Sequence, residues 1–211
     1  AKIQTHVEKR IANTTAPSAI LAFFLTRDPL TGEGKMQLAR ALFATGDRDA
    51  AILQIRAAWT DRNFVLADEQ RLVSLYGAYL KTEDHLARAD RLLWSREVTT
   101  ARRVFAKLPA RQQRMAEARA ALLLGAKNGP ALFDSLPSAD RLDSGVLHAA
   151  VRYYRRIEQE PRAVQLARQS PSDPAAIRNP VRWWEERRTG SGGKWRRAAP
   201  GWPANWQRFC G

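Results

Sequence analysis

The sequence predicts an all-α protein, built as an irregular α-solenoid, or superhelix, of stacked antiparallel helix hairpins. Two observations on the 211-residue chain carry this prediction. Apolar residues recur at helical spacing along most of the sequence, whereas the alternation typical of strands is hard to find. Short turns rich in Gly, Asp, Asn and Pro separate the apolar segments, as expected for helices that fold back on one another.

Two apolar stripes illustrate the helical spacing. Each places its members three or four residues apart, so that they lie on one face of a helix and are expected to be buried. The stripes consist of Ala51, Ile55 and Trp59, and of Leu72, Leu75, Tyr76 and Tyr79.

Helix starts and stops can be placed along the rest of the chain. Thr82 is expected to cap a helix whose first turn carries Glu83 and Asp84, where acids complement the helix dipole. Leu86, Ala89 and Leu93 would form its buried face. Further helices are expected at about residues 17–25, 35–45, 97–107, 111–124, 141–157, 161–168 and 179–188.

A loose internal repeat favours stacked hairpins. Ala51, Ala101 and Ala163 each follow a charged turn and would start the second helix of a pair, where a small side chain lets helices approach closely. The spacings of 50 and 62 residues are irregular, so the repeat is tetratricopeptide-like rather than strict.

The charge balance points to anionic partners. Lys and Arg number 35 against 21 Asp and Glu, which gives 35 − 21 = +14. Such a surface attracts nucleic acid, an anionic membrane face or a glycan bearing carboxylates, although compositional bias towards Arg explains the excess equally well. The basic residues that share helix faces, and are candidates for contacting a polymer, are Arg103, Lys107, Arg111, Arg114, His148, Arg152, Arg155 and Arg156.

Several classes of function find no support in the sequence. Cys210 is the single cysteine and the three histidines are scattered, so no disulfide, metal site or cofactor is expected. The longest apolar run, residues 19–25, is too short to span a membrane, and no helix-turn-helix or zinc-finger signature predicts specific nucleic-acid binding. The chain lacks an initial Met and a signal pattern, and is expected to be a fragment or a mature chain.

Several motifs, taken in order, resemble one known family. They are AILAFF at 19–24, TGEG at 31–34, LARAL at 38–42, ARADRLLW at 87–94 with TARR at 100–103, and WWEERR at 183–188. Over about residues 16–189 the chain resembles the superhelical region of soluble lytic murein transglycosylases. The resemblance implies a periplasmic, non-catalytic scaffold that holds a peptidoglycan strand or positions a separate catalytic domain.

The catalytic motifs of that family are not found. Its general acid is a Glu followed by Ser, with a Gly-Leu-Met-Gln turn further on, and this chain has no Glu-Ser pair. The segment 34–37, Gly-Lys-Met-Gln, is only superficially similar. Glu185 and Glu186 are expected to be solvated and ionised, so the chain itself should be inactive. Trp94, Trp183 and Trp184 are expected in helix packing rather than stacked on sugars.

The sequence departs from the family after Arg188. Residues 1–189 are expected to form the superhelical domain, and residues 190–211 an irregular basic Gly/Pro/Trp tail that is non-native or disordered. A tetratricopeptide-like adaptor for a protein partner is the alternative function.

Overall fold

The computed structural model describes residues 2–170 and 177–189, and the expected tail at 190–211 lies outside them. These residues form 13 α-helices and one 3₁₀ helix, with no strand among them, which confirms the all-α class. The chain divides into two compact units, Ala1–Arg91 and Leu92–Gly211. No helix in the described ranges is both long and apolar enough to cross a membrane.

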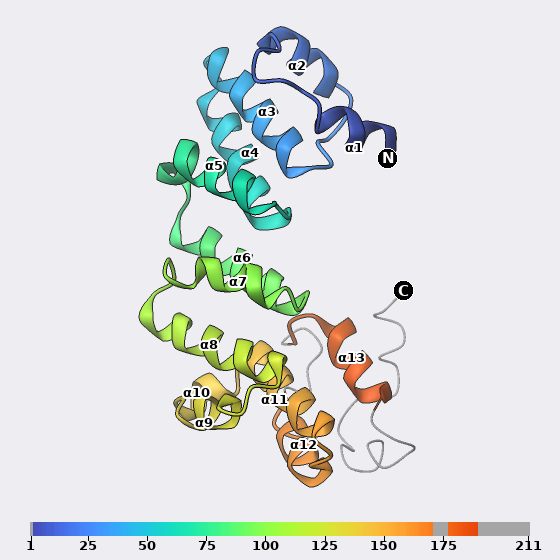
Figure 1. Ribbon diagram of the computed structural model, residues 1–211, viewed down its shortest axis with the longest axis vertical. Helices are drawn as coiled ribbons and strands as arrows, with labels where there is room; N and C mark the ends of the chain where they lie inside the picture. Colours follow the sequence, from blue (N-terminus) through green and yellow to red (C-terminus); the bar gives the residue numbers. More distant parts are fainter. Residues whose placement is uncertain (1, 171–176, 190–211) are drawn as a thin grey trace. The chain divides into compact units, whose positions relative to one another are not determined.

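The N-terminal unit contains five α-helices, a short 3₁₀ helix and most of a sixth α-helix (Figure 1). Helices α3 and α4 pack along each other as a hairpin, and Gly46, with φ 88°, makes the turn between them. The helices are α1 (Lys2–Glu8), α2 (Pro17–Phe24), α3 (Gly32–Ala44), α4 (Arg48–Asp61), α5 (Leu66–Tyr76), η1 (Gly77–Tyr79) and α6 (Thr82–Trp94).

The predicted apolar stripe on α4 is buried, whereas the predicted stripe that begins on α5 is buried only in part. Ala51, Ile55 and Trp59 are at most 3% exposed, and Leu72 is fully buried. The prediction for Leu75 was wrong, because its side chain is 55% exposed. Helix α5 ends one residue later and the chain tightens into η1, so no further helical turn covers Leu75. Tyr76 and Tyr79 are half-buried and stack on Phe43.

A buried carboxylate anchors α1, a helix that the periodicity did not predict. Glu8 is 0% exposed and accepts hydrogen bonds from the Thr31 N–H and hydroxyl, each at 2.7 Å. Thr31 in turn caps α3 through the Gly34 N–H. A Cβ atom at position 34 would lie 2.4 Å from Glu8 Oε2, so a larger residue there would displace the Glu8 carboxylate. The segment 34–37 thus lies in the first two turns of α3.

The start of α6 differs from the expected cap. The helix already includes Thr82, and the Asp84 carboxylate accepts a hydrogen bond from the Lys81 N–H at 2.8 Å. Asp84 also binds Arg56 of α4, so one carboxylate both caps the helix and ties it to its neighbour.

The C-terminal unit is built around α11, which is buried along nearly its whole length. Helices α8 and α12 pack against it. The expected helix at 141–157 corresponds to α11 but begins only at Ser144, because Asp143 caps it by accepting hydrogen bonds from the N–H groups of Gly145 and Val146. The helices are α7 (Val98–Phe105), α8 (Ala110–Leu124), α9 (Gly129–Asp134), α10 (Ser138–Arg141), α11 (Ser144–Arg156), α12 (Glu160–Ala167) and α13 (Pro180–Thr189).

The three alanines of the loose repeat are buried. Ala51, Ala101 and Ala163 are each 0% exposed. Ala51 lies in the α3–α4 pair and Ala163 in the α11–α12 pair, which are among the most extensive helix contacts of their units. A larger side chain at these positions would force the paired helices apart.

Candidate functional site

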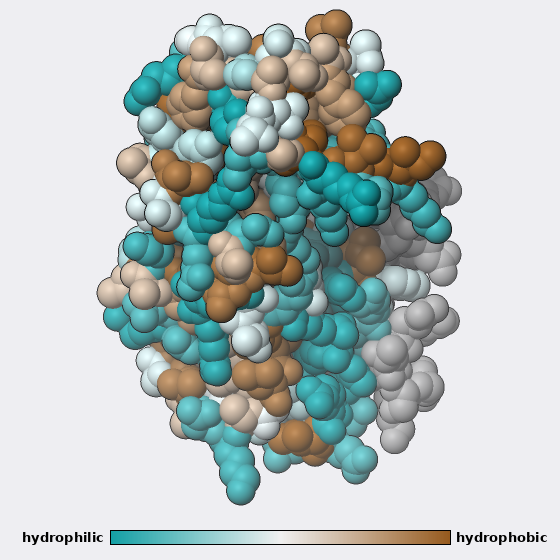
Figure 2. Space-filling view, turned by 45° about the horizontal axis from the view of Figure 1, so that its top comes forward, coloured by the Kyte–Doolittle hydropathy of each residue, from teal (hydrophilic) through white to brown (hydrophobic). Residues whose placement is uncertain are grey.

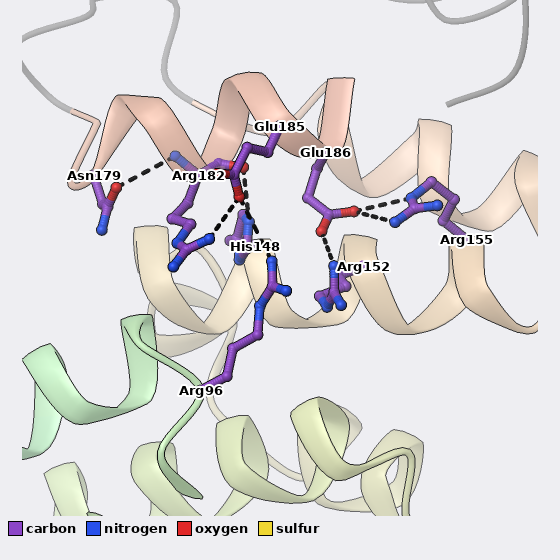
Figure 3. Close-up of polar contacts among 8 residues, drawn as sticks. All are labelled: Arg96, His148, Arg152, Arg155, Asn179, Arg182, Glu185 and Glu186. Carbon is purple, nitrogen blue, oxygen red and sulfur yellow. Dashed lines mark hydrogen bonds and ion pairs between the residues drawn. The ribbon is translucent and has the colours of Figure 1, made fainter. Parts of the chain in front are cut away.

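Charged side chains gather where α13 lies against α11 in the C-terminal unit (Figure 3). We call this group the α11–α13 charge cluster. It contains four arginines and two glutamates, an excess of two positive charges. Its members are Arg96, Arg152, Arg155, Arg182, Glu185 and Glu186.

Trp183 and Asn179 place α13 on α11. The Trp183 side chain is 2% exposed, and its indole N–H donates to the Ser144 hydroxyl at 3.2 Å. The Asn179 side-chain oxygen accepts a hydrogen bond from the Arg182 N–H and so covers a free donor in the first helical turn. These contacts fix one face of α13 against α11. Glu185 and Glu186, which are adjacent in the sequence, therefore bind different arginines.

Glu186 is the buried carboxylate of the cluster. It is 2% exposed and binds Arg152 and Arg155 of α11, the latter through Nη2 at 2.7 Å and Nε at 2.9 Å (Figure 3). Burial on its own would raise the pKa of Glu186, but the hydrogen bonds from the two guanidinium groups outweigh burial and leave that pKa lowered. The expectation that Glu186 is solvated was wrong, because Arg152 and Arg155 replace water as its partners.

Glu185 lies at the open side of the cluster. Its side chain is 39% exposed and pairs with Arg182 at 2.7 Å and with Arg96 at 3.6 Å. Arg96 stands between α6 and α7 with φ 62°, an unusual backbone conformation for a residue other than glycine. Burial is the main cause that lowers the pKa of Arg96, and the neighbouring Arg152 and Arg182 act in the same direction.

His148 lies in the core beside this cluster, not on a basic surface stripe. It is 3% exposed and sits between the rings of Trp94 and Trp183, with centroid distances of 4.9 and 5.2 Å. Its Nε2 lies 3.2 Å from the Arg182 carbonyl, which can only accept, so Nε2 carries the proton. Burial is the main cause that lowers the pKa of His148 to about 4. The ring is therefore neutral at pH 7 and unsuited to holding a polyanion.

Some of the other residues predicted to contact a polymer are bound to partners within the fold, and others are exposed. Arg152 and Arg155 hold Glu186, so replacing them would loosen α13 as well as remove charge. Arg111 donates through Nε to Asp140 at 2.9 Å, and Arg103 donates to the Thr100 hydroxyl. The residues with exposed side chains are Arg103, Lys107, Arg111, Arg114 and Arg156.

The tryptophans behave as the sequence predicted. Trp94 and Trp183 are 7% and 2% exposed, and the buried Arg119 guanidinium lies 4.6 Å from the centre of the Trp94 ring. Trp184 is partly buried against the same core. Their rings contribute to packing and are not presented to a sugar.

The charge cluster combines residues that no single sequence signal connects. The sequence did not indicate Arg96, because its partner Glu185 lies on a distant helix. Two signals were present: the i, i+3 spacing of Arg182 and Glu185 on α13, and the paired spacing of Arg152 and Arg155 on α11.

The site and fold define an all-α protein whose second unit carries an arginine–carboxylate cluster between α11 and α13. No protein-family model, curated protein or solved structure matches this chain. Within the described ranges, no three His, Cys, Asp or Glu side chains are grouped in a way that could hold a metal ion. The polar interactions in the α11–α13 charge cluster are ion pairs between arginines and glutamates.

Replacing Glu186 with Gln is expected to free α13 from α11. Arg152 and Arg155 would lose their shared carboxylate, and the local opening free energy of α13 should fall by about 2–3 kcal/mol. Hydrogen exchange of the α13 amides should then be clearly faster, because local opening exposes them.

Glu185→Gln is the matched control, since it removes the same charge from the next residue. Its exposed ion pairs should contribute less than about 1 kcal/mol, so α13 exchange should change little. Equal acceleration in the two variants would contradict the role given to Glu186.

Proposed function

We propose that this chain is a non-catalytic helical scaffold segment of a peptidoglycan-cleaving lytic transglycosylase. Its helix hairpins would stack into an irregular α-solenoid in the periplasm. The scaffold would hold a glycan strand bearing carboxylates, or position a neighbouring catalytic domain, by shape and positive charge. The resemblance of residues 16–189 to that family is the starting point.

The observation that carries a scaffold role is how the buried carboxylates are used. Each accepts hydrogen bonds from backbone N–H, hydroxyl or guanidinium groups within its own unit, so each serves to join helices. A general acid for glycan cleavage instead needs a carboxyl group that keeps its proton near neutral pH. The buried carboxylates are Glu8, Glu69, Asp84, Asp140 and Glu186.

Positive charge supports the choice of an anionic partner. The face shown in Figure 2 is largely hydrophilic, with apolar side chains scattered over it. Lys107, Arg114 and Arg156 are exposed, and their side chains make no hydrogen bond or ion pair with other described residues. Charges of this kind attract a polyanion through counterion release and bind it without sequence specificity.

One feature favours the alternative, a tetratricopeptide-like adaptor. In the N-terminal unit a surface groove of about 450 Å³ runs between α3 and α5. It is lined by charges of both signs, including Arg40, Arg71 and Asp68, beside the exposed Leu75. A mixed groove between helices suits a peptide segment. Binding of this kind should survive salt, whereas polyanion binding should not.

Sedimentation with purified peptidoglycan tests the proposal. The chain should co-sediment at 50 mM salt, and binding should fall at least about tenfold by 200 mM, because salt competes with the released counterions. Replacing Lys107, Arg114 and Arg156 together with Gln should weaken binding severalfold without unfolding the chain. The chain alone should release no anhydromuropeptides.

A second triple variant, Lys2→Gln, Lys9→Gln and Arg10→Gln, removes the same charge from exposed positions in the N-terminal unit. It should bind nearly as well as the parent if charge acts along one face of the C-terminal unit. Equal loss in both triple variants would contradict a defined contact face. Release of anhydromuropeptides would contradict the scaffold role itself.

A further inference from the structure

A small surface pocket lies between α9, α10 and α12 in the C-terminal unit, away from the charge cluster. We call it the α9–α12 pocket. Its volume is about 220 Å³. Four polar side chains and an apolar floor line it, and the residues that matter are Ser138, Arg141, Arg162, Gln169, Phe133 and Leu166.

The pocket carries two positive charges and no carboxylate in its lining. Arg141, at the end of α10, makes no side-chain hydrogen bond or ion pair with any described residue. Arg162 donates to the neighbouring Gln165 at 2.8 Å, and its nearest carboxylate, Asp134, is 3.8 Å away and half-exposed. Two guanidinium groups in one pocket, of which Arg162 has only the distant and half-exposed Asp134 as its acid, favour an anionic ligand.

The floor of the pocket is apolar. Phe133 and Leu166 are buried at 1% and 3% exposure and belong to the core of the unit. A bare inorganic anion gains nothing from such a floor, whereas an anion that carries a short apolar group can bury it there. The pocket is thus divided into a cationic rim and an apolar base.

Size limits the ligand to an end group. A volume of 220 Å³ is below the roughly 300–1,000 Å³ of pockets that enclose whole small-molecule ligands. Ser138 and Gln169 add one hydroxyl and one amide, groups that can both donate and accept. They suit an amide bond placed next to the anion. A carboxylate, an adjacent amide and a small apolar side chain together make up the C-terminus of a peptide.

We propose that the α9–α12 pocket binds the free C-terminal carboxylate of a peptide whose last residue is small and apolar. Arg141 and Arg162 hold the carboxylate, the hydroxyl of Ser138 and the amide of Gln169 meet the last peptide group, and the apolar floor takes the side chain. Arginine forks bind carboxylates through paired hydrogen bonds, which gives this site its selectivity. The inference does not depend on the scaffold proposal.

Titration with N-acetyl-Ala-Ala, monitored by NMR, tests the site. The free acid should shift the signals of Arg141 and Arg162, and the C-terminal amide of the same dipeptide should bind at least about tenfold more weakly, because hydrogen bonds to a charged group are lost. Inorganic phosphate should also bind more weakly than the free acid, since it cannot use the apolar floor. These comparisons use the unaltered chain.

Arg141→Gln should weaken binding of the acid about ten- to hundredfold, because one of the two guanidinium groups that hold the carboxylate is removed. Arg156→Gln, which removes an exposed arginine outside the pocket, should leave affinity unchanged. Equal binding of acid and amide, or an Arg141→Gln variant that binds normally, would overturn the proposal. Phosphate binding as tightly as the acid would overturn the peptide assignment.

Discussion

Replacing Arg88 with Met is expected to lower the free energy of unfolding of the N-terminal unit by about 3–5 kcal/mol. Arg88 is 0% exposed and pairs with the buried Glu69 at 2.8 Å. It also donates to the carbonyl oxygens of Trp59 and Arg62 and lies 4.3 Å from the centre of the Trp59 ring. The variant would leave a buried carboxylate without its cation, which is why the loss should be large.

Urea denaturation of the unit measures this effect, and a double variant separates its causes. Arg88→Met combined with Glu69→Met removes both charges and should be less destabilised than Arg88→Met alone, since no uncompensated charge stays buried. Arg91→Met is a matched control on the same helix, where the side chain is only half-buried. If the single Arg88 variant were as stable as the parent, the pair would have no structural role.

The C-terminal unit is expected to lose about 3 kcal/mol of stability as the pH falls from about 6.5 to about 4. The pKa of His148 in the folded unit is about 4, because of burial, against an ordinary value of 6.5. Within this window the unfolded chain binds a proton at His148 and the folded unit does not, so acid favours unfolding. Above the window the contribution of His148 is fully present.

Glu186 acts in the same direction at lower pH. Its folded pKa lies below the ordinary 4.5, because the bonds from Arg152 and Arg155 outweigh burial. The stability contributed by Glu186 is therefore present above about pH 4.5 and is lost as the pH falls through the folded pKa. His148 and Glu186 therefore make the C-terminal unit less stable in acid over two adjoining pH ranges.

His148→Phe should flatten the pH dependence above pH 4. The variant keeps an aromatic ring between Trp94 and Trp183 but has no group to protonate. It should cost about 1 kcal/mol at pH 7, because the Arg182 carbonyl loses its donor. Thermal unfolding at a series of pH values provides the measurement, with the exposed His6→Gln as the control. An unchanged pH profile in His148→Phe would exclude His148 as the acid-sensitive group.

The sequence by itself determined the helical class and most helix positions. Periodicity located the buried Ala51, Ile55 and Trp59, and it failed where a helix is short or lies at the end of a pattern. Helices α1 and α9 span seven and six residues, too few to show a repeat in apolar spacing. Leu75 satisfied the spacing but lies where its helix stops.

The tertiary structure alone decided which charges are surface charges. Along the sequence, His148, Arg152, Arg155 and Arg156 form one basic stripe, and Glu186 looks like a solvated acid. In the fold, α13 lies over three members of this stripe, buries Glu186 between Arg152 and Arg155, and leaves Arg156 exposed. Helical spacing reports which residues share a face. Whether that face meets water or a carboxylate more than 30 residues away depends on long-range packing, which local sequence does not record.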